Sequence, residues 1–205
     1  MEIALLPPLI DQIIRETSSQ GWCFLPRLLS DQDLTLINQF IDQHKGDFVA
    51  AKVGKGSNQA RREEIRGDYT LWLDPLSPPE PFRPAVQFLD QLLVALNREL
   101  FLGVKEFETH LAYYPPGTFY KTHLDKHEQN SSRAFSFVFY LNQEWSEENG
   151  GELVIYNKEN KALTTVFPKP GSMICFLSED FPHEVKAAKC ERRSLTGWMH
   201  TKIIN

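Results

Sequence analysis

From Phe107 onward the apolar residues of the chain change from a helical spacing to a period of two. Clusters of glycine, proline and asparagine separate the apolar runs at intervals of roughly 8–12 residues, as in antiparallel sandwiches and barrels. We expect strands over residues 106–114, 133–141, 151–156, 163–167, 172–177, 183–187 and 192–200. Alternate side chains of such strands share one face, so this half of the chain predicts a β core.

The first half of the chain predicts helices that support this core. Apolar residues recur at helical spacing in residues 9–18, 34–41 and 85–96. Ser30 is a suitable N-cap for the second of these helices. Two further strands are expected at 22–25 and 65–73, and a long exposed loop at 46–64.

The expected architecture is therefore α+β, with N-terminal supporting helices and a barrel-like β core. A length of 205 residues suits one domain, and nothing in the sequence resembles a linker to a second. Within this single domain, residues 1–104 would supply the helices and a mobile loop, and residues 105–205 the β core.

Composition excludes several classes of partner. The formal net charge of −5 gives no general attraction to nucleic acid or anionic lipid, so neither is expected as a partner. No apolar run approaches the length of a membrane span, and the N-terminus lacks the basic region of a signal peptide. The cysteines Cys23, Cys175 and Cys190 show no paired spacing, which favours free thiols and a cytoplasmic location.

The stretch YYPPGTFYKTHLD ends in His123 and Asp125. These residues are two apart, so on a strand or extended turn both side chains point the same way. With His183, in FPHEV, they form a set of two histidines and one carboxylate, as in the non-haem Fe(II) oxygenases. The short motif alone is weak evidence, because single histidines are more often surface or hydrogen-bonded residues.

A basic pair, Arg192 and Arg193, opens the last expected strand. An inward-facing arginine beside a metal fits an oxo-dicarboxylic acid, which chelates iron at one end and meets the arginine at the other. Strand alternation places Arg192 on the face of Thr196 and Trp198, which favours Arg192 over Arg193. The alternative is that Arg192 and Arg193 are solvent-exposed arginines at a strand end and bind no ligand.

Tyrosines lie on two of the expected strands. Tyr140 has a hydroxyl that is suited to the same carboxylate, and Tyr114 is a candidate for the pocket wall. For both, a core tyrosine with a satisfied hydroxyl is the alternative.

Five motifs occur in a specific order: YPPGTFYKTHLD, FYLNQEW, NGGELVIY, FPHEV and RRSLTGW. Together they resemble the 2-oxoglutarate- and iron-dependent prolyl hydroxylases. The likeness is strongest to the hypoxia-inducible-factor prolyl hydroxylases and to bacterial relatives that hydroxylate elongation factor Tu. It covers roughly residues 20–200 and implies a double-stranded β-helix, the jelly-roll or cupin-like fold.

The resemblance also implies roles for individual residues. The catalytic iron ligands would be His123, Asp125 and His183. 2-Oxoglutarate would be bound by Arg192 and Tyr140, in a pocket lined by Tyr114, Leu153, Thr196 and Trp198. One departure is Arg193, where relatives usually carry an aromatic residue.

The implied reaction is hydroxylation of a prolyl residue in a protein, with release of succinate and CO2. Fe(II), 2-oxoglutarate and O2 would be required, with ascorbate as a further candidate cofactor. The partner would be a protein with an exposed prolyl segment, like elongation factor Tu if the source is bacterial, and a role in oxygen sensing is expected. The loop from Lys52 to Glu64 would close on that segment, anchored by Arg66 and Asp68.

Other readings stay open from the sequence. A zinc hydrolase is disfavoured because His123 and His127 lack the intervening glutamate, whose place Leu124 takes. Nucleic-acid demethylases of this type resemble the chain less, since Ala112 and Trp198 stand at two of their characteristic positions. An oxygenase acting on another peptide residue or a small molecule, and a non-catalytic β-barrel binding module, are the remaining alternatives.

Overall fold

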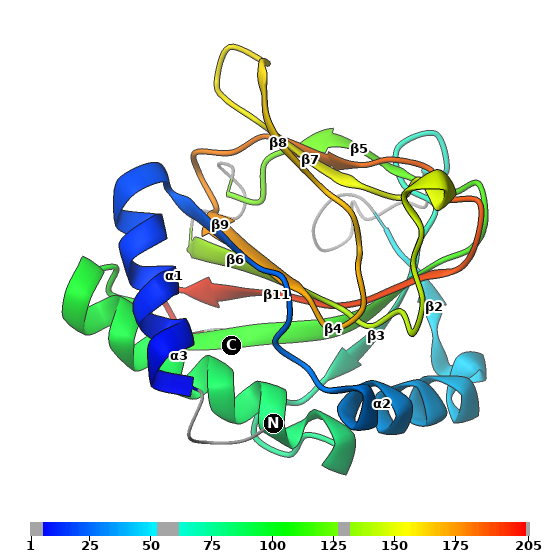
Figure 1. Cartoon of the computed structure of the whole chain (residues 1–205), viewed down its shortest axis with the longest axis horizontal. Coiled ribbons are helices and arrows are strands. Elements are labelled where there is room, and N and C mark those ends of the chain that lie inside the picture. The colour runs from blue at the N-terminus through cyan, green and yellow to red at the C-terminus, as the bar shows by residue number, and fades with distance from the viewer. Residues whose placement is uncertain (1–5, 53–61, 127–131, 204–205) are drawn as a thin grey trace.

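A computed structural model describes residues 6–52, 62–126 and 132–203. Two antiparallel sheets face each other, and the helices lie beneath the larger one (Figure 1). The larger sheet has the order β1-β9-β6-β11-β4-β3-β2 and the smaller one β5-β10-β7-β8. This two-layer arrangement is the double-stranded β-helix expected from the sequence.

The larger sheet consists of β1 (Trp22–Leu25), β2 (Val49–Ala50), β3 (Tyr69–Leu73), β4 (Glu106–Tyr114), β6 (Arg133–Tyr140), β9 (Met173–Leu177) and β11 (Arg192–His200). The smaller sheet consists of β5 (Tyr120–His123), β7 (Leu153–Tyr156), β8 (Ala162–Val166) and β10 (His183–Val185). The helices are α1 (Leu6–Gln20), α2 (Asp31–Gln43) and α3 (Arg83–Leu100). All seven strands expected in the second half are present, with ends shifted by at most two residues.

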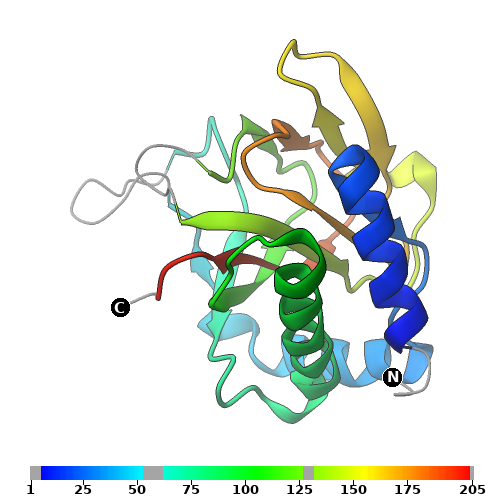
Figure 2. The same cartoon turned by 90° about the vertical axis from the view of Figure 1, so that its left-hand side faces the viewer.

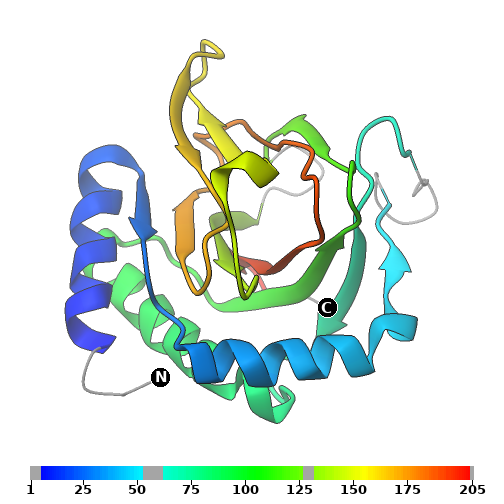
Figure 3. The same ribbon diagram turned by 45° about the vertical axis from the view of Figure 1, so that its right-hand side comes forward.

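The N-terminal half supplies strands as well as helices, because β1, β2 and β3 belong to the larger sheet. Figure 2 shows α1 and α3 side by side against this sheet, and Figure 3 shows α2 running beneath the same sheet. The N-terminus of α2 confirms the expected cap. The Ser30 hydroxyl accepts a hydrogen bond from the Asp33 amide at 3.1 Å, and the Asp33 carboxylate accepts one from the Ser30 amide at 3.0 Å.

The side chains of β6 divide between two apolar clusters. Phe135, Phe137 and Phe139 point toward the helices and join the cluster beneath the larger sheet. Val138 and Tyr140 point the other way, into the cluster between the sheets. Full burial of a phenylalanine contributes about 1.5–3 kcal/mol, so this alternation fixes the register of β6.

Two local expectations were wrong. The loop expected at 46–64 includes β2, which pairs with β3, and the strand expected from Ile65 begins only at Tyr69. Ile65 and Gly67 instead make backbone hydrogen bonds to the segment around Tyr120. These hydrogen bonds hold Ile65 and Gly67 beside the start of β5, so β3 begins only at Tyr69.

Most of the loop that we expected to close over a substrate, residues 53–61, lies outside the described residues. Among the helices in the described ranges, none combines the length and the apolar character that crossing a bilayer requires.

Candidate active site

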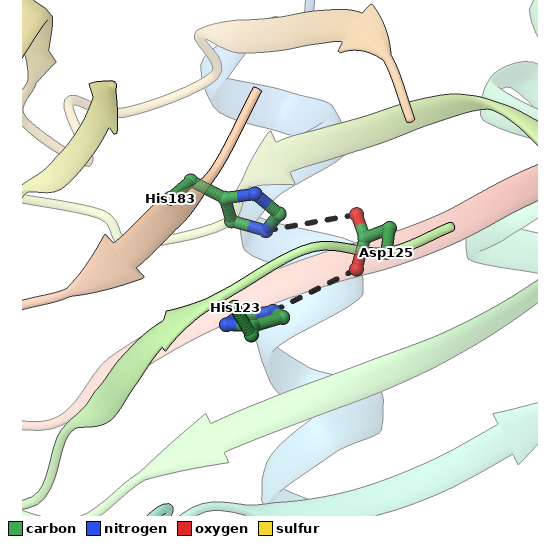
Figure 4. A group of neighbouring side chains, drawn as sticks. All are labelled: His123, Asp125 and His183. Carbon is green, nitrogen blue, oxygen red and sulfur yellow. Dashed lines mark ion pairs between the residues drawn. The ribbon is translucent and has the colours of Figure 1, made fainter. Parts of the chain in front are cut away.

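Two strands of the smaller sheet bring the predicted metal ligands together. His123 ends β5 and His183 begins β10, and the two residues are direct partners in the antiparallel ladder. Asp125 follows in the turn after β5. Its Oδ1 lies 3.6 Å from Nε2 of His123, and its Oδ2 lies 3.6 Å from Nε2 of His183 (Figure 4). Within the described part of the chain, the three residues form a group able to hold a metal ion.

The orientation of both imidazoles suits a metal site. Nδ1 of His123 contacts the carbonyl oxygen of Lys121 at 2.9 Å, and Nδ1 of His183 contacts that of Phe181 at 3.0 Å. Metal-binding histidines usually hold their second nitrogen in this way, which leaves Nε2 for the ion. Ligands at about 2.1 Å from an octahedral ion are about 3.0 Å apart, so the 3.6 Å separations need only a small contraction.

The electrostatics favour the protonation states that bind a metal. Burial lowers the pKa of His123, and the neighbouring His183 lowers it further. Burial alone would raise the pKa of Asp125, but the positive potential of His183, His123 and Arg133 and the hydrogen bond from Ser136 bring a net lowering. The lowered pKa of His123 favours its neutral imidazole and that of Asp125 its ionised carboxylate, which are the forms that bind a divalent ion.

A cavity of about 1010 Å³ opens between the sheets and is lined by all three ligands and by Arg192. Arg192 is 1% exposed, and its Nε donates a hydrogen bond to the carbonyl oxygen of Gly151 at 2.9 Å. Its guanidinium carbon lies 5.1 Å from the ring centroids of both Tyr114 and Tyr140. Its Nη2 is buried and makes no hydrogen bond to any described residue. A buried cation with an unused donor is costly, so an anion in the cavity would stabilise it.

Tyr140 is fully buried beside this arginine, and its hydroxyl likewise makes no hydrogen bond within the described ranges. Burial raises the pKa of Tyr140 to about 12, although the charge of Arg192 acts in the opposite direction. The phenol therefore stays protonated and is able to donate. Tyr140 is not among the described residues that line the cavity, whereas the remaining predicted pocket residues line it: Tyr114, Leu153, Thr196 and Trp198. The unused donors of Arg192 and Tyr140 fit the carboxylate of an oxo-acid.

Arg193 faces the opposite side of β11, as alternation along the strand predicts. Its guanidinium donates to Asn38 and Asp42, each at 2.8 Å, and to Glu191 at 2.9 Å. Arg193 thus ties β11 to α2, and it is Arg192 that reaches the cavity.

Several cavity residues were missed from the sequence. Ser136 donates a hydrogen bond to Asp125, and Arg133 pairs with Glu108 at 2.8 Å while its guanidinium carbon lies 3.4 Å from the ring centroid of Trp198. His110 is 3% exposed, with its ring 4.7 Å from that of Trp72 and 5.4 Å from that of Trp198. Period-two alternation was the available signal for His110 and Ser136, which share the inward faces of β4 and β6. Alternation gave no signal for Arg133, because the register shifts at that end of β6. His127, part of the zinc-hydrolase alternative, lies outside the described residues.

Comparison with known proteins identifies the superfamily of the chain. The family model of the 2OG-Fe(II) oxygenase superfamily matches residues 109–200. A prolyl-4-hydroxylase from Pseudomonas putida is 33% identical in sequence, with a TM-score of 0.83, and the match covers 95% of this chain and 100% of that one. A prolyl hydroxylase from Trichoplax adhaerens, solved with a hypoxia inducible factor peptide, shares the fold, with a TM-score of 0.85 at 24% identity over 97% of this chain and 92% of that one.

Curated relatives are longer than this chain. An uncharacterized PKHD-type hydroxylase of Synechocystis is 28% identical over 86% of this chain and 61% of its own length. Human Egl nine homolog 1 is 28% identical over 66% of this chain and 33% of its own length. The match thus covers about three-fifths of the length of the Synechocystis protein and about one-third of the length of the human protein. From its match to the Pseudomonas putida protein along nearly the whole length, the chain belongs to the 2-oxoglutarate- and Fe(II)-dependent oxygenase superfamily.

Proposed function

We propose that this chain is a 2-oxoglutarate- and Fe(II)-dependent dioxygenase that hydroxylates a prolyl residue of a protein substrate. The observation that carries the proposal is one cavity lined both by the group His123, Asp125 and His183 and by a buried arginine with an unused donor. The three ligands would hold Fe(II), leaving three coordination positions open. Bound iron, 2-oxoglutarate and O2 would together supply the oxidation of a substrate C–H bond.

The protein's own contribution is binding and orientation. Arg192 would take the far carboxylate of 2-oxoglutarate in a charge-assisted hydrogen bond, with its guanidinium held in place by Gly151. Tyr140 would donate a second hydrogen bond to the same carboxylate. Both groups are buried, so the contacts would form away from water, where they are strongest.

The walls of the cavity favour a polypeptide substrate. A volume of about 1010 Å³ exceeds what a small oxo-acid needs. Four exposed apolar side chains are among the cavity-lining residues: Val49, Trp72, Leu124 and Ile203. Exposed apolar groups beside a cavity are typical of a surface that binds a partner. The relation to a prolyl-4-hydroxylase supports proline as the target residue.

The test is hydroxylation of defined protein substrates. The purified chain would be incubated with Fe(II), 2-oxoglutarate, ascorbate and O2, and with elongation factor Tu or a panel of proline-containing peptides. Tandem mass spectrometry would then locate any added oxygen atom. We expect the oxygen on a prolyl residue, and no addition with His183→Ala, which lacks one metal ligand. Oxygen on another residue type would favour a different peptide oxygenase, and turnover only with small molecules would contradict a protein substrate.

A further inference from the structure

The planar side chains of Arg66, Tyr120 and His123 form a stack that ends on a residue of the metal-binding group. The ring of Tyr120 lies on that of His123, with centroids 3.7 Å apart and an interplanar angle of 14°. The guanidinium carbon of Arg66 is 4.1 Å from the centroid of the same tyrosine ring. Tyr120 is therefore in contact with a metal-binding imidazole and with an arginine.

The arginine of this stack is itself fixed. Its Nε and Nη2 donate to the two carboxylate oxygens of Asp68 at 2.7 and 2.6 Å. Asp68 is 2% exposed, so the pair is held inside the protein. A bidentate guanidinium–carboxylate pair restricts the plane of the guanidinium as well as its position. Arg66 is thus a rigid support for Tyr120.

The backbone reinforces the same contact. The Gly67 amide donates to the carbonyl oxygen of Phe119 at 3.0 Å, and the Lys121 amide donates to that of Ile65 at 2.9 Å. A Cβ atom at Gly67 would lie 2.8 Å from Cβ of Thr118, closer than real contacts allow. The absence of a side chain therefore lets this segment lie against the start of β5.

A metal ligand needs its ring plane as well as its tautomer to be set. The contact from Nδ1 of His123 to Lys121 favours one tautomer but leaves rotation of the ring only partly restrained. Stacking on Tyr120 restrains the ring plane. Nε2 then stays directed toward Asp125.

We propose that Tyr120, supported by Arg66 and Asp68, is a positioning residue that holds the His123 imidazole ready for the metal. The proposal rests on the metal site assigned under the proposed function. Because the ring is oriented before the ion arrives, less conformational entropy is lost on binding. Loss of residues that orient metal ligands typically costs about 10–100-fold in metal affinity.

The test is titration of Co(II) into the metal-free protein by calorimetry, without 2-oxoglutarate or substrate, so that turnover plays no part. We expect Tyr120→Leu to weaken Co(II) binding at least about tenfold. Tyr120→Phe retains the stacked ring and loses only the hydroxyl, so its affinity should stay near that of the wild type. Tyr156→Leu, which removes a tyrosine from β7, is the matched control and should bind Co(II) normally.

Arg66→Ala tests the outer layer of the stack independently, should the leucine variant fail to fold. It should weaken Co(II) binding in the same direction, and NMR should show the His123 ring protons losing part of the upfield shift that Tyr120 induces in the metal-free protein. Wild-type Co(II) affinity and wild-type chemical shifts in Arg66→Ala would show that Arg66 does not support Tyr120.

His123→Ala separates this inference from the proposed metal site. Wild-type Co(II) affinity in His123→Ala would overturn the metal site itself. Loss of binding in His123→Ala together with wild-type affinity in a folded Tyr120→Leu would overturn the positioning role and leave the metal site standing. Equal losses in Tyr120→Phe and Tyr120→Leu would assign the effect to the hydroxyl and contradict the stack.

Discussion

The hydroxyl of Ser136 donates a hydrogen bond of 2.7 Å to Oδ2 of Asp125, which ties the middle of β6 to the turn that follows β5. The same hydroxyl lies 2.8 Å from that of Ser178. Both serines are buried, so the carboxylate is oriented from the larger sheet while the two histidines come from the smaller one.

Ser136→Ala should therefore weaken metal binding by about tenfold, because the Asp125 carboxylate would lose a buried hydrogen bond that orients it. Ser136→Thr retains the hydroxyl and should recover most of the affinity. Calorimetric titration with Co(II) measures both. Equal affinity of Ser136→Ala and the wild type would show that the turn alone orients Asp125.

Arg192→Ala should raise the requirement for 2-oxoglutarate by about ten- to a hundredfold, since a charge-assisted contact contributes about 1.5–3 kcal/mol. Arg193→Ala is the matched control from the other face of β11. It should leave 2-oxoglutarate binding near the wild-type value and instead lower the free energy of unfolding, because its contacts to Asn38, Asp42 and Glu191 would be lost. Steady-state kinetics and chemical denaturation separate the two effects. A larger rise in the 2-oxoglutarate KM for Arg193→Ala would reverse the assignment.

Gly151→Ala should also impair 2-oxoglutarate binding, through the position of Arg192. Gly151 has φ +70°, and an added Cβ would lie 2.8 Å from Cβ of Ala188 and 3.4 Å from Cδ of Arg192. Gly103→Ala is the control for backbone strain, because Gly103 has φ +66° with nothing within 4 Å of its Cβ position. We expect both variants to lose stability and only Gly151→Ala to lose 2-oxoglutarate affinity. Equal 2-oxoglutarate affinity in the two variants would argue against the role of Gly151.

His110 predicts a pH dependence of stability. Burial, followed by the charge of Arg66, lowers the pKa of His110 to about 4 from its ordinary 6.5. Between these values the unfolded chain takes up a proton that the folded chain does not, so stability falls as pH drops from 6.5 toward 4. The full loss of stability is about 3 kcal/mol. His110→Gln should lose less over this range in denaturation experiments. Parallel pH profiles for the two proteins would exclude His110 as the source.

The sequence predicted most of the larger sheet and the opposite orientations of Arg192 and Arg193. β4 and β11 are nine residues long, and their expected bounds agree with the structure because long alternating runs carry a strong signal. His123 and His183 are about sixty residues apart in the chain, but the sequence still predicted them as ligands of one site, because both lay beside expected strands.

Shorter and polar segments were not predictable in this way. β5 has the sequence YKTH, without apolar alternation, and becomes a strand through pairing with β10. β2 is two residues long and exists through its pairing with β3. The stack of Arg66 on Tyr120 joins residues far apart in the chain, so only the folded structure brings them together.

The most direct test of the account is succinate formation from 2-oxoglutarate, compared between the wild type and three variants, His123→Ala, Asp125→Ala and His183→Ala. We expect succinate from the wild type only when Fe(II) and 2-oxoglutarate are both added, with inhibition by Co(II), Ni(II) or Zn(II), which bind such sites more tightly than Fe(II) in most cases. Each variant should fold, by circular dichroism, and form no succinate above background. Wild-type succinate formation by any folded variant of the three would contradict the assignment of His123, Asp125 and His183 as the iron ligands.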